Sequence, residues 1–277
     1  MNKLEAVLVD LDGSLLDSRK RISEDDLQTI HTLKEKGVRF HIVTGRPFPF
    51  TKQCAEDTGF DNPVSCNNGA YVYDFSEEKI VFHAGLIDTK DVIEIRNFCL
   101  ENGIDYLLYA LEDVIFDRPD SKRTLHWKKI SDELFNERNK LKFLYDSPDL
   151  DLSPYHFVKL LLPYISDENA EKIRERYGKD GRYEICFSEK SVLDITPSGI
   201  TKAFAVETLA RLYGFDLRNA LVLGDNFNDE SMLKVCGYPV VPENGEEEMK
   251  KLARYITTDN DHSPLTHAVK ALFPELL

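Results

Sequence analysis

The sequence has little of what marks secreted, membrane-bound or cysteine-based proteins. Five cysteines are dispersed through 277 residues and form no Cys-x-x-Cys motif. This number and spacing argue against a disulfide framework or a zinc site and favour free thiols in a reducing compartment. The longest apolar runs, such as residues 160–162, are far too short to cross a bilayer, and no signal pattern precedes the first predicted strand. We therefore expect a cytoplasmic protein without a membrane anchor.

Basic residues are also in deficit. Lys and Arg together number 35 against 49 Asp and Glu, which gives a formal net charge of -14. So acidic a chain is unsuited to nucleic acid or to an anionic membrane, because both require a basic face. Small anionic substrates are still compatible with this charge, since a metal ion and one or two basic side chains can set the local field. We expect a small-molecule partner, and a chain that is a monomer or a homodimer.

The first strand leads directly into two carboxylates. An apolar run ends at Asp10, Asp12 lies two residues further on, and Gly13-Ser14 turns the chain away. Two carboxylates this close together repel each other, and removing them from water at the end of a buried strand is costly. A bound Mg²⁺ would remove this difficulty, because it takes carboxylate and backbone oxygens as ligands. Taken alone, the four residues are equally compatible with a polar strand end and a glycine turn.

The N-terminal segments alternate between strands and helices. Helical spacing follows Ser23, a second strand covers residues 38–43, a helix covers residues 48–58, and a third strand covers residues 63–66. Short links between such elements are typical of a parallel sheet with right-handed crossovers. Ligands bind beyond the carboxyl ends of the strands in these sheets. Asp10 and the segment starting at Thr44 both lie at such ends, so we expect them to face one crevice.

The pattern changes after the third strand and returns near the C-terminus. A hairpin is predicted around residues 71–82, followed by segments typical of a partly antiparallel α+β unit. With 42% hydrophobic residues, the chain can form two domains. We predict a doubly wound, mostly parallel Rossmann-like α/β core at residues 1–84 and 191–277, with an α+β cap inserted at residues 85–190. No Gly-x-Gly-x-x-Gly follows the first strand, which disfavours dinucleotide redox chemistry.

Four polar clusters lie at the ends or edges of the predicted core elements. They are Asp10-x-Asp12-Gly13-Ser14, Thr44-Gly45-Arg46, Gly199-Ile200-Thr201-Lys202 and Gly224-Asp225-Asn226-Phe227-Asn228-Asp229. In their order and their spacing relative to the strands, they resemble the motifs of the haloacid dehalogenase superfamily of phosphatases. The inserted segment and the run Cys66-Asn67-Asn68-Gly69-Ala70 resemble its Cof-type branch, which carries a large α/β cap. The resemblance covers essentially the whole chain.

The resemblance implies a nucleophile and an acid/base. Asp10 supplies a carboxylate at a strand end, suited to in-line attack on phosphorus and to an aspartyl-phosphate intermediate. Asp12 would protonate the leaving alkoxide and then take a proton from the hydrolytic water. Asp225 is expected to complete a Mg²⁺ site with Asp10 and the backbone carbonyl of Asp12. For Asp229, both a second carboxylate for metal-bound water and a first-turn helix residue are possible.

The same resemblance implies a phosphate-binding set. Its expected members are Thr44, Gly45, Lys202 and Asn228, with Lys202 neutralising the phosphate and the Asp10 charge. Arg46 either reaches the substrate or pairs with an acidic neighbour. Asn68 and Gly69 are expected to border the site, although Asn-Gly is also an ordinary turn. In the cap, five residues either contact the leaving group or serve as ordinary surface and core residues: Tyr109, Arg118, Arg123, His126 and Trp127.

These expectations together describe a Mg²⁺-dependent phosphatase acting on small soluble phosphomonoesters such as sugar phosphates, nucleotides or phosphorylated cofactors. One alternative is a sugar phosphomutase, which would share the aspartyl-phosphate intermediate but shelter it from water. A second alternative, from another class, is a non-catalytic phosphometabolite-binding protein. Such a protein would be free to lose the nucleophile or the acid/base, whereas Asp10, Asp12, Lys202 and Asp225 are all present.

Overall fold

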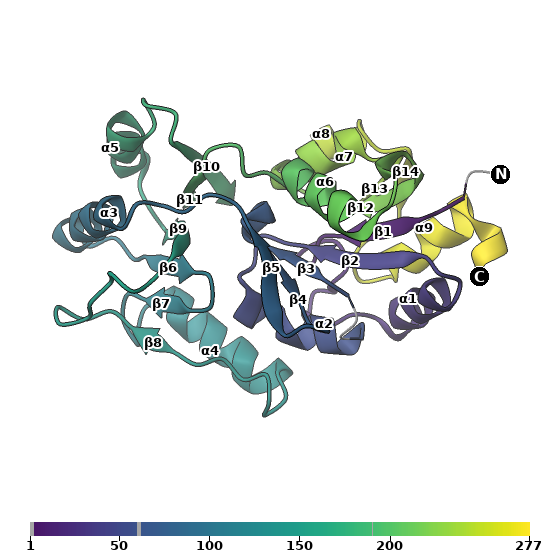
Figure 1. Ribbon diagram of the computed structural model, residues 1–277, viewed down its shortest axis with the longest axis horizontal. Coiled ribbons are helices and arrows are strands. Elements are labelled where there is room, and N and C mark those ends of the chain that lie inside the picture. Colours follow the sequence, from purple (N-terminus) through teal and green to yellow (C-terminus); the bar gives the residue numbers. More distant parts are fainter. Residues whose placement is uncertain (1–2, 60–61, 190) are drawn as a thin grey trace. The chain divides into compact units, whose positions relative to one another are not determined.

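The computed structural model describes residues 3–59, 62–189 and 191–277 (Figure 1). The chain forms two compact units. The core unit comprises Met1–Arg46, Thr51–His83 and Thr201–Leu277, and the cap unit comprises Pro47–Phe50 and Ala84–Ile200. No helix among the described residues has the length and apolar character needed to span a membrane.

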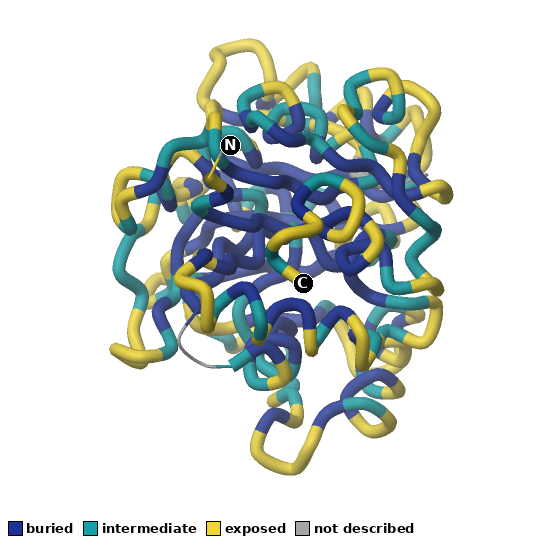
Figure 2. Tube along the Cα trace, turned by 90° about the vertical axis from the view of Figure 1, so that its right-hand side faces the viewer, coloured by how far each residue is buried: buried dark blue, intermediate teal, exposed yellow. Residues whose placement is uncertain are grey.

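The core unit is built on an eight-stranded sheet. Its strands, in spatial order, are β14 (Tyr255–Thr257), β13 (Tyr238–Pro242), β12 (Ala220–Leu223), β1 (Ala6–Val9), β2 (Arg39–Val43), β3 (Val64–Cys66), β4 (Tyr71–Asp74) and β5 (Lys79–His83). Neighbouring strands from β14 to β3 are parallel, and β4 and β5 form the predicted antiparallel hairpin at one edge. All four residues of β1 are buried, as are the other dark blue segments of Figure 2. A strand that is buried on both faces has apolar residues at successive positions, and this is why β1 could be found from the sequence.

Helices cover both faces of this sheet. They are α1 (Glu24–Glu35), α2 (Lys52–Asp57), α6 (Lys202–Tyr213), α7 (Glu230–Val235), α8 (Glu247–Lys250) and α9 (Pro264–Leu272), with short 3-10 turns η2 (Asn67–Gly69), η3 (Leu217–Asn219), η4 (Phe227–Asp229) and η5 (Pro274–Leu276). Ala6 and Leu8 of β1 belong to one apolar cluster with residues of α6 and α7. Val7 and Val9 point to the opposite face, because side chains alternate along a strand. The predicted doubly wound, mostly parallel core is confirmed.

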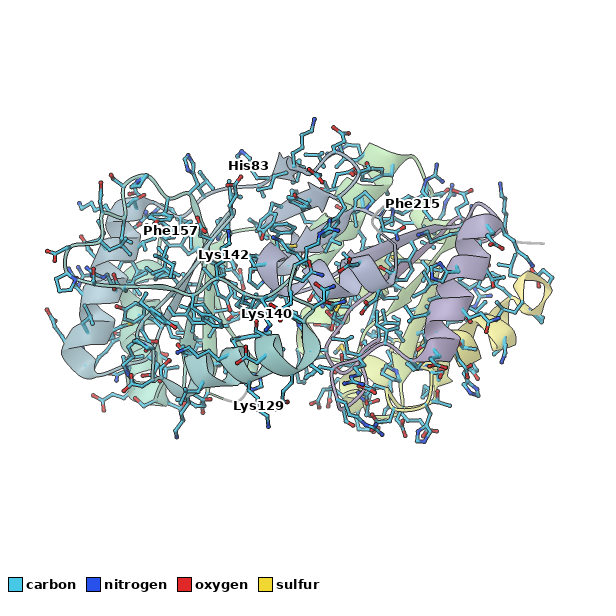
Figure 3. The ribbon with its side chains drawn as sticks, turned by 90° about the horizontal axis from the view of Figure 1, so that it is seen from below. His83, Lys129, Lys140, Lys142, Phe157 and Phe215 are labelled. Carbon is cyan, nitrogen blue, oxygen red and sulfur yellow. The ribbon has the colours of Figure 1, made fainter. Side chains whose placement is uncertain are left out.

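The cap unit contains a six-stranded, mostly antiparallel sheet. Its strands, in spatial order, are β10 (Tyr183–Glu189), β11 (Val192–Pro197), β9 (Phe157–Pro163), β6 (Leu107–Ala110), β7 (Val114–Phe116) and β8 (Leu144–Tyr145), and its helices are α3 (Thr89–Asn102), α4 (Lys122–Leu134), α5 (Asp167–Tyr177) and the 3-10 turn η1 (Phe48–Phe50). Phe157, labelled in Figure 3, lies in an apolar cluster with residues of α3 and α5. This α+β organisation agrees with the sequence prediction.

Two boundaries differ from those expected. The cap unit extends to Ile200 rather than ending at residue 190, because β11 pairs with both β10 and β9 in the cap sheet. It also includes Pro47–Phe50, of which residues 48–50 were expected to begin a core helix. There the chain instead makes the turn η1 and the shorter helix α2. Strand pairing and helix length depend on contacts between distant segments, so local patterns did not settle these limits.

Candidate active site

The predicted site residues come from the carboxyl ends of three adjacent parallel strands. Asp10 follows β1, Thr44 follows β2, and Asp225 lies two residues after the end of β12. Val9 is in register with Leu223 on one side and with Ile42 on the other. Because parallel strands end at the same edge of a sheet, the three turns that follow them meet. The structure thus brings these distant segments together at one place in the core unit.

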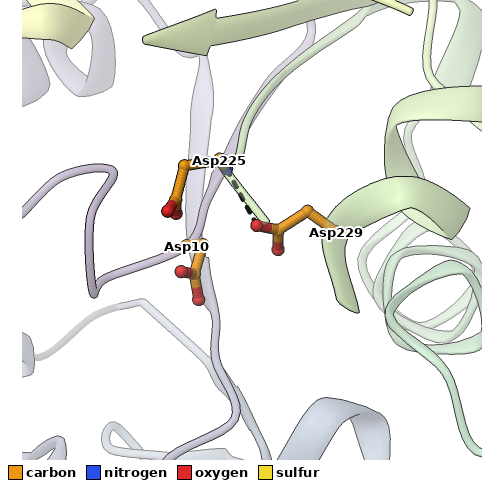
Figure 4. A group of neighbouring side chains, drawn as sticks. All are labelled: Asp10, Asp225 and Asp229. Atoms are coloured by element: carbon orange, nitrogen blue, oxygen red, sulfur yellow. Dashed lines mark hydrogen bonds between the residues drawn. The ribbon is translucent and has the colours of Figure 1, made fainter. Parts of the chain in front are cut away.

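Three carboxylates form a compact cluster at this edge. One carboxylate oxygen from each of Asp10, Asp225 and Asp229 lies within 4.8 Å of the other two (Figure 4). Asp229 Oδ2 accepts hydrogen bonds from the backbone N–H groups of Asp225 and Asn226, both at 2.9 Å. Gly224 is required here, since a Cβ atom at that position would lie 2.7 Å from Asp229 Cβ. Asp229 therefore belongs to the carboxylate cluster while also closing the turn at the start of η4.

Lys202 is fully buried and pairs with two of these carboxylates. Its Nζ donates to Asp10 Oδ1 at 2.6 Å and to Asp229 Oδ1 at 2.5 Å. The first turn of α6 presents it, with Thr201 Oγ1 accepting from Phe204 N at 3.2 Å. Burial alone would lower the pKa of Lys202, but the two carboxylates raise it, so the side chain remains an ammonium. The cluster therefore holds three carboxylates and one compensating cation.

The excess negative charge is reflected in the carboxyl pKa values. Burial raises the pKa of Asp10 well above its usual value, and Lys202 offsets this only in part. Burial and the neighbouring Asp229 raise the pKa of Asp225 to about 6. Ser14 Oγ donates to Asp225 Oδ1 at 2.8 Å, which orients that side chain. Carboxylate oxygens with an excess of negative charge suit a hard divalent cation, so these residues fit Mg²⁺.

Asp12 lies outside this cluster and makes a different set of contacts. Arg46 donates from Nε to Asp12 Oδ2 at 2.6 Å and from Nη2 to Oδ1 at 2.7 Å. Lys20 Nζ donates to Oδ1 at 2.7 Å. Burial would raise the pKa of Asp12, but Arg46 and Lys20 hold it well below its usual range. Arg46 was expected either to reach the substrate or to pair with an acidic neighbour, and in the structure it pairs with Asp12.

Lys20 is a site residue that the sequence did not reveal. Lysine is common on protein surfaces, and Lys20 lies in a charged stretch eight residues after Asp12 with no motif around it. Only the bend between the two residues brings the ammonium onto the carboxylate. Asn244 was also missed: its Nδ2 donates to the backbone oxygen of Gly13 at 2.8 Å.

The remaining predicted residues form a connected network beside the carboxylates. The Thr44 backbone oxygen accepts from Asn68 N at 2.9 Å, and Asn228 Nδ2 donates to Asn68 Oδ1 at 3.3 Å. A Cβ atom on Gly45 would lie 3.2 Å from Asn68 Oδ1. Gly69 has φ +107°, and a Cβ atom there would lie 2.9 Å from the Thr201 backbone oxygen. Gly69 thus permits close packing of its turn against the start of α6.

The aromatic residues considered in the cap have packing roles in the structure. Trp127 packs against Phe50 with its ring tilted by 35° and ring centroids 4.1 Å apart, and Tyr109 is buried nearby, 6.5 Å from the same ring. Arg118 pairs with Asp105 at 2.6 Å at the cap surface. These contacts lie within the cap unit.

Comparison with known proteins identifies the family. A sequence profile of the haloacid dehalogenase-like hydrolases matches residues 7–269. A protein of Streptococcus pyogenes serotype M6, provisionally named a phosphatase, is 30% identical over 275 residues, covering 96% of this chain and 97% of the relative. The Bacillus subtilis 5-amino-6-(5-phospho-D-ribitylamino)uracil phosphatase YcsE is 24% identical, covering 96% and 95% of the two chains.

Two further similarities agree with this assignment. The Escherichia coli pyridoxal phosphate phosphatase YbhA is 24% identical, covering 92% of this chain and 93% of the relative. A crystal structure of a haloacid dehalogenase-like hydrolase from Bacteroides thetaiotaomicron superposes with a TM-score of 0.82 at 23% identity, covering 98% and 100% of the two chains. The chain therefore belongs to the haloacid dehalogenase-like hydrolase family, within which it is a phosphoric monoester hydrolase.

Proposed function

We propose that this enzyme hydrolyses small soluble phosphomonoesters with Mg²⁺, through a phosphoryl group carried transiently on Asp10. The observation that carries the proposal is the ion pair between Lys202 and Asp10 inside the carboxylate cluster, at the end of the central strand. A buried ammonium beside a buried carboxylate positions the nucleophile and adds positive charge where a phosphoryl group would bind. Purely structural packing would not require this concentration of charge at a strand end.

In the first step, a carboxylate oxygen of Asp10 attacks phosphorus and the bond from phosphorus to the ester oxygen breaks. Asp12 gives its proton to the departing oxygen, and the alcohol leaves. In the second step, water attacks the phosphoryl group on Asp10 while Asp12 takes a proton from that water. The bond from phosphorus to Asp10 breaks, which releases inorganic phosphate and restores both carboxyl groups to their starting states.

Asp12 must alternate between acid and base for this sequence. Its contacts with Arg46 and Lys20 favour the carboxylate, which is the form needed to accept a proton from water. A phosphoryl dianion next to Asp12 would raise its proton affinity, because like charges disfavour a second anion. Substrate binding would therefore favour the acid form that the first step requires.

The metal site would be formed by Asp10, Asp225 and the backbone carbonyl of Asp12, with Asp229 beside it. When bound, Mg²⁺ would neutralise charge on the phosphoryl oxygens. Lys202, whose Nζ donates to Asp10 Oδ1, would add positive charge beside the same phosphoryl group. Thr44, Gly45 and Asn228, linked through Asn68, would complete the phosphate-binding set.

The names of the relatives support a small phosphorylated metabolite as substrate. Pyridoxal phosphate and a phosphoribitylamino-uracil are both compact phosphomonoesters with polar rings. Sugar phosphates, nucleotides and phosphorylated cofactors fall in the same chemical class. A site that binds chiefly the phosphoryl group accepts several leaving groups, so we expect activity on more than one member of this class.

The test is phosphate release from a panel of phosphomonoesters with Mg²⁺, with EDTA, and with Asp10→Asn. We expect release only by the wild type with Mg²⁺. Release that persists in Asp10→Asn would overturn the role of Asp10. A folded, Mg²⁺-binding protein that cleaves no ester would overturn hydrolysis and would call for mutase assays with a bisphosphate activator.

A further inference from the structure

Lys20 and Arg46 occupy the two oxygens of Asp12 unequally. Asp12 Oδ1 accepts from Lys20 Nζ and from Arg46 Nη2, both at 2.7 Å. Asp12 Oδ2 accepts only from Arg46 Nε, at 2.6 Å, among the described residues. A carboxylate oxygen offers about two lone-pair positions. In this arrangement Oδ1 is saturated, while Oδ2 keeps one position for a further partner.

We propose that Lys20 is a positioning residue: by occupying Asp12 Oδ1, it leaves Oδ2 as the oxygen that gives and accepts the proton. The inference rests on the proposed role of Asp12 as acid and base. Arg46 fixes the plane of the carboxylate by its two-point contact, as guanidinium groups do with carboxylates. Without Lys20, however, Oδ1 regains a lone pair, and either oxygen can face the leaving group. Lys20 removes that ambiguity without itself contacting the reacting atoms.

The turn that carries Lys20 is organised around one side chain. Lys20 has φ +63°, a left-handed conformation that is uncommon for residues other than glycine. Asp17 Oδ1 accepts from the backbone N–H groups of Arg19 at 2.8 Å and Arg21 at 2.9 Å, and the Asp17 backbone oxygen accepts from Lys20 N at 2.9 Å. These bonds hold a conformation that costs about 1–3 kcal/mol elsewhere.

A distant segment of the core unit anchors the same turn. Asp261 Oδ1 accepts from Ser18 N at 2.7 Å, and Asn260 Nδ2 donates to the Leu16 backbone oxygen at 2.8 Å. An isolated exposed ion pair contributes little to stability. A lysine whose backbone is fixed from two directions, and whose ammonium meets a carboxylate already paired with a buried arginine, is better explained by positioning.

The leaving group provides a selective readout. An alkyl phosphate needs a proton on its departing oxygen, whereas p-nitrophenyl phosphate releases a stable phenolate without one. Loss of proton delivery therefore lowers kcat/KM for the alkyl ester only, because kcat/KM reports the steps up to transfer of the phosphoryl group. A change that merely loosens the structure lowers both values together.

The experiment compares kcat/KM on both esters for wild type, Lys20→Met, Lys20→Arg and Arg19→Met. Methionine keeps the length of the side chain and tolerates φ +63° no worse than lysine. We expect Lys20→Met to lower kcat/KM on the alkyl ester by about tenfold or more and on p-nitrophenyl phosphate by less than about twofold. Lys20→Arg, which keeps the positive charge, should retain most of the wild-type kcat/KM on the alkyl ester. Arg19→Met, which removes an exposed charge from the same turn, should change neither value.

Equal losses on both esters, or no loss, would overturn the role of Lys20. Asp12→Asn separates this failure from that of the proposed function. If Asp12→Asn shows the selective loss and Lys20→Met does not, the role of Lys20 alone is wrong. If Asp12→Asn loses no activity on the alkyl ester, the acid role of Asp12 is wrong, and the inference fails with it.

Discussion

Lys202 Nζ lies 2.6 Å from Asp10 Oδ1 and is fully buried between Asp10 and Asp229. Replacing Lys202 with methionine leaves both carboxylates buried without their cation. Breaking a buried pair in this way costs about 3–5 kcal/mol. We expect Lys202→Met to lower the free energy of unfolding by this amount in EDTA and to lower phosphate release at least about 100-fold. Urea unfolding and a phosphate-release assay measure the two effects.

Removing one of the partner charges supplies the control. The double variant Lys202→Met/Asp229→Asn should regain part of the lost stability, because fewer buried negative charges then remain uncompensated. It should regain no activity, since Asp10 still lacks its cation. A double variant no more stable than Lys202→Met would contradict the assignment of the stability loss to unpaired carboxylates, because residues in contact should show coupling.

Gly13 makes room for the Asp225 carboxylate. Its φ is +80°, and a Cβ atom there would lie 2.4 Å from Asp225 Oδ2. Asp225 can escape this clash by rotating away, which spares the fold but disrupts the carboxylate cluster. We therefore expect Gly13→Ala to reduce stability by only about 1–2 kcal/mol, from the left-handed backbone, while lowering activity at least about 100-fold.

Gly37 offers a matched control for this substitution. It has φ +79°, and a Cβ atom there would meet nothing within 4 Å. Gly37→Ala carries the same backbone strain without crowding the site. Thermal melts and phosphate release on both variants should therefore show similar losses of stability but a loss of activity only in Gly13→Ala. A similar loss of activity in the two variants would refute the steric explanation.

How much of this site the sequence could predict depends on whether the signal is local. Asp10 and Asp225 were found because each follows an apolar run that could only be a buried strand, and parallel strands share a carboxyl edge. Resemblance to the family then supplied Lys202, which composition alone would leave on the surface. Each of these residues lies in a short motif that can be recognised within a few positions, and the structure brings them together.

The parts that the sequence did not predict depend on long-range pairing. Lys20 reaches Asp12 only because a left-handed turn folds back, and lysine carries no signal for such a bend. The end of the cap unit was misplaced because β11 is apolar enough to suit either sheet, and its partners β9 and β10 are chosen by tertiary packing. Asp229 kept two interpretations. Its hydrogen bonds show that it closes the turn at the start of η4, whereas a role toward metal-bound water stays a prediction.

Asp225 is expected to oppose stability when no metal is bound. Burial and Asp229 raise its pKa to about 6, so keeping it ionised above that pH costs about 3 kcal/mol. Asp225→Asn should therefore melt at a higher temperature than wild type in EDTA. Excess MgCl₂ should stabilise the wild type, by about 2.7 kcal/mol at 100 times the dissociation constant, and should not stabilise the variant. Differential scanning calorimetry with and without Mg²⁺ tests both effects. An equal Mg²⁺ shift in the two proteins would place the ion elsewhere.

His41 should make the protein less stable as the pH falls. It is buried, its Nδ1 lies 3.2 Å from the Pro63 backbone oxygen, and its ring lies 5.3 Å from that of Tyr213 and 5.5 Å from that of Phe215, which is labelled in Figure 3. Burial lowers the pKa of His41 from 6.5 to about 4. The unfolded chain therefore binds the proton first, and stability declines as pH falls from 6.5 toward 4, by about 3 kcal/mol in total.

Urea unfolding at roughly pH 7.5 and pH 5.5 measures this effect. Because the unfolded chain is already mostly protonated at about pH 5.5, the wild type should lose about 1 kcal/mol through His41 over that interval. His41→Gln removes the titrating ring, so it should start less stable at the higher pH, through lost packing, yet lose about 1 kcal/mol less on acidification. His31→Gln, a change at an exposed position on α1, controls for the loss of a histidine. If all three proteins lose the same stability between the two pH values, the proton is taken up elsewhere and His41 does not account for the acid sensitivity.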